Sequence, residues 1–221
     1  MKTLNNVLIF GDSYSTFGGY IPEGFRIYYD VVPDKTGDIN RGTDLNDVTQ
    51  TWWYQVIEQT GSTLIQNNSW SGSTVCYTGY EGDCSRTSSF IYRLEKLEQD
   101  GFFDDNKIDT VFIFGGTNDC WAGDLLGDVQ LSDWKREDLF SFLPAYCYML
   151  HRLKEILPDA EILCIGNCDL KDEFMAGIKD ACAACGVKFI QLTDIEKISG
   201  HPTVAGMKQI TGQILDQINK K

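Results

Sequence analysis

The sequence predicts a three-layer α/β/α sandwich around a five-stranded parallel sheet. Short apolar runs that are continuous instead of alternating are typical of strands buried on both faces of such a sheet. The chain has five of them, at residues 7–10, 62–67, 110–114, 161–166 and 187–192. Helical patterns lie between and after them, at about 50–60, 85–99, 136–157, 171–185 and 203–219. Strands and helices thus recur along the chain in the manner of a doubly wound α/β fold.

Local signals support these elements in chain order. The strand candidates are rich in residues that favour strands, and each run ends at polar residues or glycine. The first helix opens at Trp52-Trp53. In the third helix, apolar residues recur at helical spacing from Leu139 to Leu157, and Pro158 closes it. The last helix begins next to Pro202, a residue type favoured in a first helical turn.

Length and charge limit the classes of function. A chain of 221 residues can bury a full core, and we expect one domain over residues 1–221. The formal charge of −13 repels nucleic acid and anionic membrane surfaces, so neither is expected as a partner. The apolar run Val7–Phe10 is shorter than the roughly 7 to 15 apolar residues of a secretory signal. We therefore expect a cytoplasmic location, although a chain that had lost a leader would look the same.

The eight cysteines do not show the paired spacing of a zinc site. The single CxxC, Cys182-Ala-Ala-Cys185, falls late in the expected 171–185 helix, away from the helix start where a thiol is activated. We therefore expect reduced, mostly buried thiols, and neither a metal nor a cofactor. Cys76 and Cys84 flank a short loop, and whether they pair stays open at this point.

Two connections are longer than is usual in a compact domain, residues 14 to about 49 and residues 120–135. Such segments often serve as walls or lids of a functional site. In an open parallel sheet, the chemistry gathers beyond the carboxyl ends of the strands. The residues that follow the strands are therefore the first candidates for a site.

Four chemically useful residues follow these strand ends. Ser13 follows the first strand, Gly72 the second, Asn118 the third and His201 the fifth. Together they supply a nucleophile, a base and donors for a developing oxyanion, which are the parts that acyl transfer needs. The other histidine, His151, lies off the apolar stripe of its helix and is interpreted as solvated. A lone histidine at the position of His201 could be a residue of a helix cap, but the neighbouring serine and asparagine favour a catalytic role.

Four sequence blocks in this order resemble the SGNH (GDSL-type) hydrolase superfamily over nearly the whole chain. The blocks are Gly11-Asp12-Ser13, Gly72 within NNSWSGST, Gly116-Thr117-Asn118-Asp119 and His201-Pro202. The resemblance implies a flavodoxin-like topology and a carboxylic ester hydrolase without a cofactor. It implies that Ser13 is the nucleophile and His201 the general base. It also implies an oxyanion hole made by the N–H groups of Ser13 and Gly72 and by the amide of Asn118.

One position departs from the superfamily pattern. Its members usually carry an Asp three residues before the histidine, whereas this chain has Ile198, whose side chain cannot accept a hydrogen bond. Asp194, Glu196, a main-chain carbonyl of Ile198 or Ser199, or a water could orient the imidazole instead. We favour a serine–histidine dyad with a main-chain carbonyl on the imidazole, since a neutral carbonyl can fix the tautomer as a carboxylate does.

Residues beside these blocks suggest the substrate. Tyr14, Trp70 and Trp121 are close to the blocks in sequence and are expected to line the pocket. Flat rings with polar neighbours suit a sugar or an aryl group, so we expect a small-acyl ester such as an O-acetylated carbohydrate. Asp12 and Asp119 are interpreted as residues that hold their loops by hydrogen bonds. The sequence leaves the oligomeric state open.

Other functions stay open on the sequence. Lysophospholipase, thioesterase and aryl esterase are alternatives within the superfamily. A flavodoxin-like FMN-binding protein would use Ser13, Ser15 and Thr16 as a phosphate cradle, but it leaves His201 and Asn118 unexplained. A catalytically inactive, carbohydrate-binding relative is a further alternative, because the usual Asp is missing.

Overall fold

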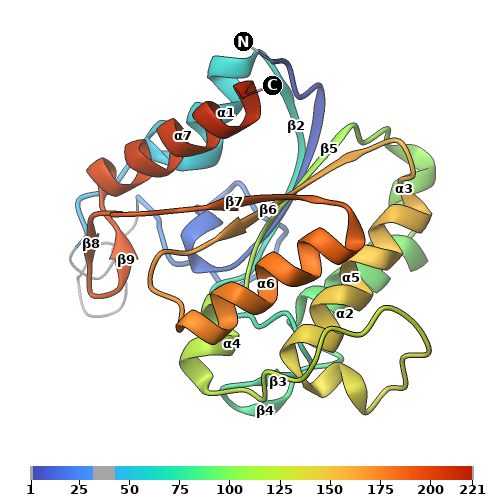
Figure 1. Ribbon diagram of the computed structural model, residues 1–221. Helices are drawn as coiled ribbons and strands as arrows, with labels where there is room; N and C mark the ends of the chain where they lie inside the picture. Colours follow the sequence, from blue (N-terminus) through green and yellow to red (C-terminus); the bar gives the residue numbers. More distant parts are fainter. Residues whose placement is uncertain (1, 32–42, 221) are drawn as a thin grey trace.

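The fold is a three-layer α/β/α sandwich, as the sequence predicts (Figure 1). The computed structural model describes residues 2–31 and 43–220. A five-stranded parallel sheet in the order β2-β1-β5-β6-β7 forms the middle layer. All five predicted strands are confirmed, each with ends close to its predicted range. The strands are β1 Asn6–Gly11, β2 Thr63–Ser69, β5 Thr110–Phe114, β6 Glu161–Gly166 and β7 Lys188–Gln191.

Helices cover both faces of the sheet (Figure 1). Two of them lie together on one face, and the other three long helices cover the opposite face. The first pair is α1 Trp52–Thr60 and α7 Val204–Asn219. The second set is α2 Phe90–Gln99, α5 Phe142–Ile156 and α6 Asp172–Cys185.

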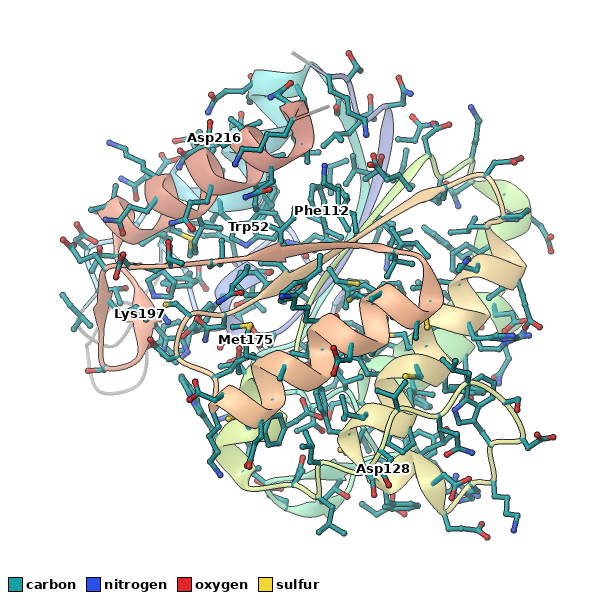
Figure 2. The ribbon with its side chains drawn as sticks, in the orientation of Figure 1. Trp52, Phe112, Asp128, Met175, Lys197 and Asp216 are labelled. Carbon is teal, nitrogen blue, oxygen red and sulfur yellow. The ribbon has the colours of Figure 1, made fainter. Side chains whose placement is uncertain are left out.

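Each central strand contributes to two hydrophobic cores. In β1, Val7 packs into the core that includes residues of α1 and α7, and Leu8 packs into the core that includes α2, α5 and α6. In the first core Trp52 meets Phe112 edge-on, with ring centroids 5.5 Å apart, and both are labelled in Figure 2. Both faces of these strands are therefore buried, which explains why the apolar runs are continuous.

The register of the sheet brings three strand ends to one level. Gly11, the last residue of β1, pairs with Ser69 at the end of β2 and with Phe114 at the end of β5. The chain adds β2 on one side of β1 and then returns to add β5 on the other side. In a doubly wound sheet, this reversal opens a crevice at the carboxyl ends of the strands. The segments after β1, β2 and β5 meet there.

The third predicted helix, over residues 136–157, is wrong at its start. The structure has a short 3-10 turn, η4 Asp138–Phe140, then an extended Ser141, and only then α5. Pro144 explains the break, because the ring of a proline inside a helix collides with the carbonyl four residues earlier. In the first turn of α5 the same proline is tolerated, since the N–H groups there need no partner within the helix.

The sequence does not predict several short elements, because each is too brief to show a hydrophobic period. They are η1 Ser13–Ser15, η3 Val48–Gln50, α3 Phe102–Asp105, α4 Thr117–Ala122 and the hairpins β3 Thr78–Gly79 with β4 Gly82–Asp83 and β8 Lys197–Ile198 with β9 His201–Pro202. Three of them carry candidate site residues, namely η1, α4 and β9. No helix within residues 2–31 or 43–220 combines the length and apolar character needed to cross a membrane.

The two long connections differ in what they do. The first is described at residues 14–31 and 43–49, and the rest of that expected wall or lid lies outside the described residues. The second packs against α5: the Leu125 carbonyl accepts the N–H of Phe142 at 2.8 Å, and the Trp134 ring centroid lies 5.1 Å from that of His151. The later part of this stretch therefore packs against α5, whereas Trp121 near its start lies beside His201.

Candidate active site

Ser13 leaves the sheet at a sharp turn. Asp12 caps the 3-10 turn η1, and its Oδ1 accepts the N–H of Tyr14 at 3.0 Å. Gly11 has no room for a side chain, because a Cβ there would lie 2.5 Å from both Ser15 Cβ and Ser69 Oγ. The glycine thus lets β1 pack closely against its neighbours up to the residue before the turn. Ser13 itself is only 4% exposed.

His201 lies directly against Ser13. The hairpin of β8 and β9 carries His201 at the start of β9 and places its Nε2 atom 2.9 Å from Ser13 Oγ. This is hydrogen-bond distance between two residues that are 188 positions apart in the chain. The other ring nitrogen, Nδ1, lies 3.2 Å from the main-chain carbonyl oxygen of Ser199. Ser199 has φ +49°, so the turn of the hairpin bends its carbonyl toward the imidazole.

The acidic alternatives lie elsewhere. No hydrogen bond or ion pair between described residues joins Asp194 to His201, and Asp194 lies in an exposed turn with φ +52°. Glu196 accepts the hydroxyl of Thr203 at 2.5 Å instead. Ile198, at the position of the usual Asp, is 43% exposed and faces solvent. Of the groups considered from the sequence, the structure therefore brings the Ser199 carbonyl to the imidazole.

Aromatic rings enclose the imidazole. Tyr28 stacks on His201 with ring centroids 3.6 Å apart and planes 6° apart. The Tyr29 hydroxyl donates to the Pro202 carbonyl at 2.8 Å and so anchors β9. Both tyrosines come from the described part of the long connection after β1. The sequence carried no period or motif that singled them out.

Tyr14 and Trp121 also contact the histidine, from two other elements. The Tyr14 ring centroid lies 5.3 Å from that of His201, and the Trp121 centroid lies 6.1 Å from it. Tyr14 is completely buried, and its hydroxyl donates to the Gly200 carbonyl at 2.5 Å. The expectation that Tyr14 lines an open pocket is therefore wrong, since it supports the hairpin from beneath. Trp121 is 41% exposed and remains accessible beside the imidazole.

Gly72 follows the end of β2, and Asn118 follows the end of β5. Gly72 has φ +82°, a conformation that favours glycine. Asn118 is at the second position of α4, and its Nδ2 donates to the Ser73 carbonyl at 2.9 Å. Its Oδ1 accepts the hydroxyl of Tyr80 at 3.2 Å. A side-chain amide has two N–H donors, and the bond to Ser73 uses one of them.

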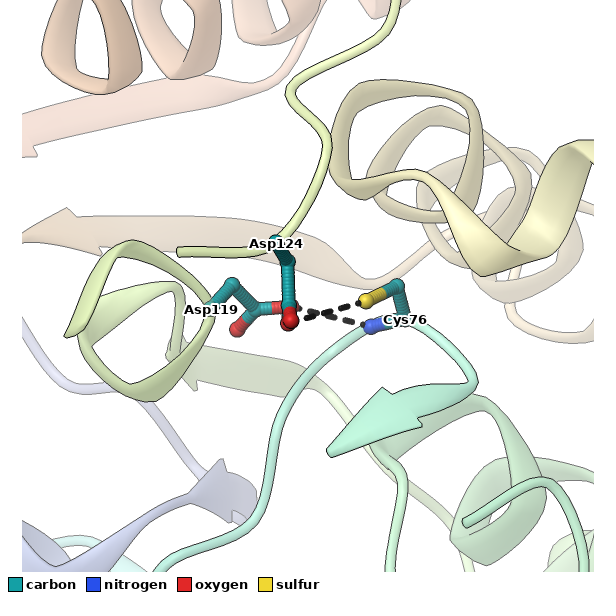
Figure 3. A group of neighbouring side chains, drawn as sticks. All are labelled: Cys76, Asp119 and Asp124. Carbon is teal, nitrogen blue, oxygen red and sulfur yellow. Dashed lines mark hydrogen bonds between the residues drawn. The ribbon is translucent and has the colours of Figure 1, made fainter. Parts of the chain in front are cut away.

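Asp119 anchors this loop from behind (Figure 3). It is completely buried, and its carboxylate oxygens accept the N–H groups of Val75 and Cys76 at 3.0 to 3.1 Å. Burial raises the pKa of Asp119 to about 7, although these two N–H groups act in the opposite direction. The Cys76 thiol donates to Asp124 at 3.4 Å. The Cys76–Asp119–Asp124 group offers metal-ligand atoms within 4.8 Å of one another. Both Asp119 oxygens accept backbone N–H groups. We therefore interpret Asp119 as a residue that anchors this loop.

Asp12 plays a comparable part beside the nucleophile. It is completely buried, and burial raises its pKa to about 7, while the Tyr14 N–H and the charge of Arg93 act to lower it. Arg93 is itself buried and lies on the same stripe of α2 as Phe90 and Leu94. A charged residue on the apolar face of a predicted helix is the signal that the sequence itself carries for this role.

The hydroxyls after Ser13 are used within the loop. Ser15 Oγ accepts the indole N–H of Trp52 at 3.2 Å. Thr16 Oγ1 donates to the Ser13 carbonyl at 3.1 Å and accepts the N–H of Tyr28 at 2.9 Å. Both side chains are completely buried. This arrangement disfavours a phosphate cradle, which needs free donors facing a ligand.

A cavity of about 410 Å³ lies beside Gly72. Its wall includes Tyr80, which is bonded to Asn118, and Trp70, whose ring centroid is 4.6 Å from that of Phe25. Trp70 thus lines a cavity, and its role in a substrate pocket stays a prediction. The cavity is also lined by Arg26, Glu81 and Asp83 and by a series of serine and threonine residues. No aliphatic side chain is among the described residues that line it.

The remaining candidates are cysteines and His151. Cys76 and Cys84 are free thiols, as are Cys182 and Cys185 at the end of α6. His151 is exposed on α5, with Nδ1 3.5 Å from Glu155, as expected for a solvated histidine.

Known proteins resemble this chain in sequence and in fold. A model of the GDSL-like lipase/acylhydrolase family matches residues 5–218. A solved structure of a GDSL-like lipase from Bacteroides ovatus ATCC 8483 is 41% identical, with a TM-score of 0.88 and 100% of each chain covered. Another, from Bacteroides uniformis ATCC 8492, is 40% identical with a TM-score of 0.87, covering 97% of this chain and 95% of its own.

A more distant structure shares the fold alone. It is a family two carbohydrate esterase from Clostridium thermocellum in complex with cellohexaose, 16% identical with a TM-score of 0.64, covering 99% of this chain and 64% of its own. No curated protein matches the chain. The family model spans nearly every residue and includes all four sequence blocks. The chain therefore belongs to the GDSL-like lipase/acylhydrolase family.

Proposed function

We propose that the protein is a serine esterase that hydrolyses a small-acyl ester, such as an O-acetylated carbohydrate, through a Ser13–His201 dyad. The observation that carries the proposal is the 2.9 Å separation between Ser13 Oγ and His201 Nε2. A hydroxyl is a weak nucleophile until a base at this distance can accept its proton. Membership of the family makes a hydrolase the expected class.

The chemistry proceeds in two halves. Ser13 Oγ attacks the ester carbonyl carbon while its proton passes to His201 Nε2, and the protonated imidazole then gives that proton to the departing alcohol. Water next attacks the acyl group on Ser13, with the imidazole again accepting and returning a proton. The acid is released and the serine is regenerated. The Ser199 carbonyl at Nδ1 holds the tautomer in which Nε2 is the free base, because Nδ1 then carries the proton.

Three donors meet the oxyanion in this mechanism: the N–H groups of Ser13 and Gly72 and the free N–H of the Asn118 amide. Two contacts support the assignment of Asn118. Its bonds to Ser73 and Tyr80 fix which end of the amide carries the nitrogen, and they leave one of its two donors unused by Ser73. A donor that is held in place before reaction stabilises the oxyanion without the cost of reorganisation.

The cavity beside Gly72 supports a polar substrate. Its wall combines two aromatic rings, Trp70 and Tyr80, with charged and hydroxyl groups. Sugar rings pack on such aromatic faces while their hydroxyls bond to the polar groups around them. A long acyl chain would instead require an aliphatic wall, which the described lining residues do not provide. The carbohydrate esterase that shares the fold agrees with this substrate class without establishing it.

A labelling experiment and an ester panel test the proposal. A fluorophosphonate probe should label the folded wild type and fail to label Ser13→Ala. The panel pairs p-nitrophenyl acetate, butyrate and octanoate with an acetylated oligosaccharide. We expect kcat/KM to fall by about tenfold or more from acetate to octanoate, and acetate to be released from the sugar. An unlabelled wild type would contradict the serine mechanism, and a preference for octanoate would contradict the substrate class.

A further inference from the structure

We propose that Arg93 is a positioning residue for the oxyanion hole, in which a single guanidinium fixes the nucleophile strand and the donor segments relative to one another. The inference rests on the proposed esterase function and goes beyond it. Arg93 belongs to none of the four sequence blocks. It lies on α2, away from the residues that would contact substrate.

All five N–H groups of Arg93 are used in hydrogen bonds. Nε donates to the Ser88 carbonyl at 3.0 Å. Nη1 donates to both the main-chain carbonyl of Asn68 and its Oδ1, the latter at 2.9 Å. Nη2 donates to the Gly11 carbonyl at 3.2 Å and to Ser73 Oγ at 3.1 Å. The side chain is 2% exposed, so no water competes for these partners.

The partners are the residues that set the site. Gly11 ends β1 two residues before Ser13. Ser73 follows Gly72 directly, and its carbonyl holds the amide of Asn118. Through these bonds, Arg93 connects the nucleophile to both segments that carry oxyanion donors. A planar group with donors in fixed directions can do this for three chain segments at once.

The charge of Arg93 adds to its geometric effect. No ion pair between described residues involves its guanidinium, so its charge is not neutralised by a direct contact. Burial lowers the pKa of Arg93 to about 9, and the nearby Asp12 acts to raise it, which leaves the group cationic at neutral pH. A buried cation next to the donor segments favours the negative charge that develops on the substrate oxygen, because the surrounding dielectric is low.

Three variants test the proposal in the full-length protein. Arg93→Lys keeps the charge but replaces the planar fork with one nitrogen that cannot reach all five acceptors. Ser73→Ala removes one contact of Arg93, together with the bond from Ser73 Oγ to the Trp70 carbonyl. Arg152→Lys is the matched control, since Arg152 lies on α5 and pairs with Glu98 and Glu155 away from the site.

We expect kcat to fall about 10²-fold in Arg93→Lys, the loss typical of a disturbed oxyanion hole. Ser73→Ala should lose about tenfold, as for one hydrogen bond to a charged group. KM should change by less than about threefold in both, because ground-state binding is little affected. Affinity for a trifluoromethyl ketone, which forms a tetrahedral adduct with the serine, should fall with kcat. A general loss of structure would instead raise KM together with the fall in kcat.

The outcomes separate this proposal from the one on which it rests. A wild type without labelling or turnover would overturn the esterase function and this inference with it. An active wild type beside a folded Arg93→Lys of unchanged kcat would overturn the inference alone. If Arg93→Lys does not fold, Ser73→Ala decides: unchanged kcat and unchanged adduct affinity overturn the inference, and a parallel loss of both supports it. Arg152→Lys should match the wild type throughout.

Discussion

The two halves of the candidate site are held in place by different forces. On the oxyanion side, buried ionisable groups hold the segments by hydrogen bonds. Arg93 donates to both Gly11 and Ser73. Asp119 accepts the N–H groups of Val75 and Cys76. On the histidine side, the contacts that the described residues make with the imidazole come from neutral groups. A stacked Tyr28, two further aromatic rings and a main-chain carbonyl surround His201.

The difference follows from what each half must do. Oxyanion donors must keep one position throughout the reaction, and groups with several strong hydrogen bonds provide that rigidity. The imidazole must alternate between neutral and protonated forms. A carbonyl supports the protonated form less than a carboxylate does, but a stacked aromatic ring is attracted to a cation. We therefore expect the stacked Tyr28 ring to offset part of the support that an Asp at position 198 would give.

The largest effect is expected from Asn118→Ala. Loss of one oxyanion donor typically lowers the rate by about 10²–10³-fold. We expect kcat to fall by that amount while KM and Tm change little, because the amide is at the edge of α4 and its removal leaves Asp119 in place. Steady-state kinetics with p-nitrophenyl acetate measures it. Wild-type turnover in the folded variant would remove Asn118 from the mechanism.

A smaller loss is expected from Tyr28→Leu. The stacked ring contributes on the order of 0.5–1.5 kcal/mol beyond its buried area, so kcat/KM should fall by roughly 3- to 10-fold. Tyr28→Phe is the matched control and should keep most of the activity, because it retains the ring. Equal losses in both variants would show that the hydroxyl matters and the stacking does not.

The Ile198→Asp variant tests whether an Asp at the usual position raises activity. The Ile198 side chain is 43% exposed, and an exposed carboxylate interacts only weakly with a neighbouring charge. We therefore expect kcat to stay within about fivefold of the wild type, since an exposed pair contributes about 1 kcal/mol at most. A larger gain would mean that the new carboxylate reaches Nδ1 and displaces the Ser199 carbonyl.

The last prediction concerns stability and its dependence on pH, which Asp119→Asn should change. Burial raises the pKa of Asp119 from 3.8 in the unfolded chain to about 7 in the folded protein. The folded state therefore binds more protons in that range, and stability should fall as pH rises from about 4 to about 7. Asp12 contributes in the same direction. Urea midpoints from pH 4 to pH 8 should decline less steeply in Asp119→Asn, and an unchanged slope would assign the decline to other groups.

The sequence was most informative where a hydrophobic pattern repeats or where several motif residues stand close together. Five continuous apolar runs predicted the strands, because burial on both faces of a sheet leaves that signature in the chain itself. Ser13, Gly72, Asn118 and His201 could be found because each follows a strand end. The prediction was wrong where one residue overrides a period, as Pro144 does at the start of α5.

Other features depend on residues that only the fold brings together. The sequence predicts a main-chain carbonyl at the His201 Nδ1 atom, but every residue has one, so only the structure distinguishes the carbonyl of Ser199 from that of Ile198. Tyr28 reaches the imidazole from a connection without periodicity, and Tyr14 turned out to be buried beneath the hairpin instead of lining a pocket. Arg93 acquires its role from acceptors on three separate segments.

The amino-acid sequence by itself determined the fold class and the family, and it supplied the four candidate residues of the proposed reaction, because these depend on hydrophobic period and on residue type at strand ends. The tertiary structure decided how those residues are held. Hydrogen bonds between distant segments depend on the direction of the donor and on differences in distance of a few tenths of an ångström. Neither can be predicted from local sequence.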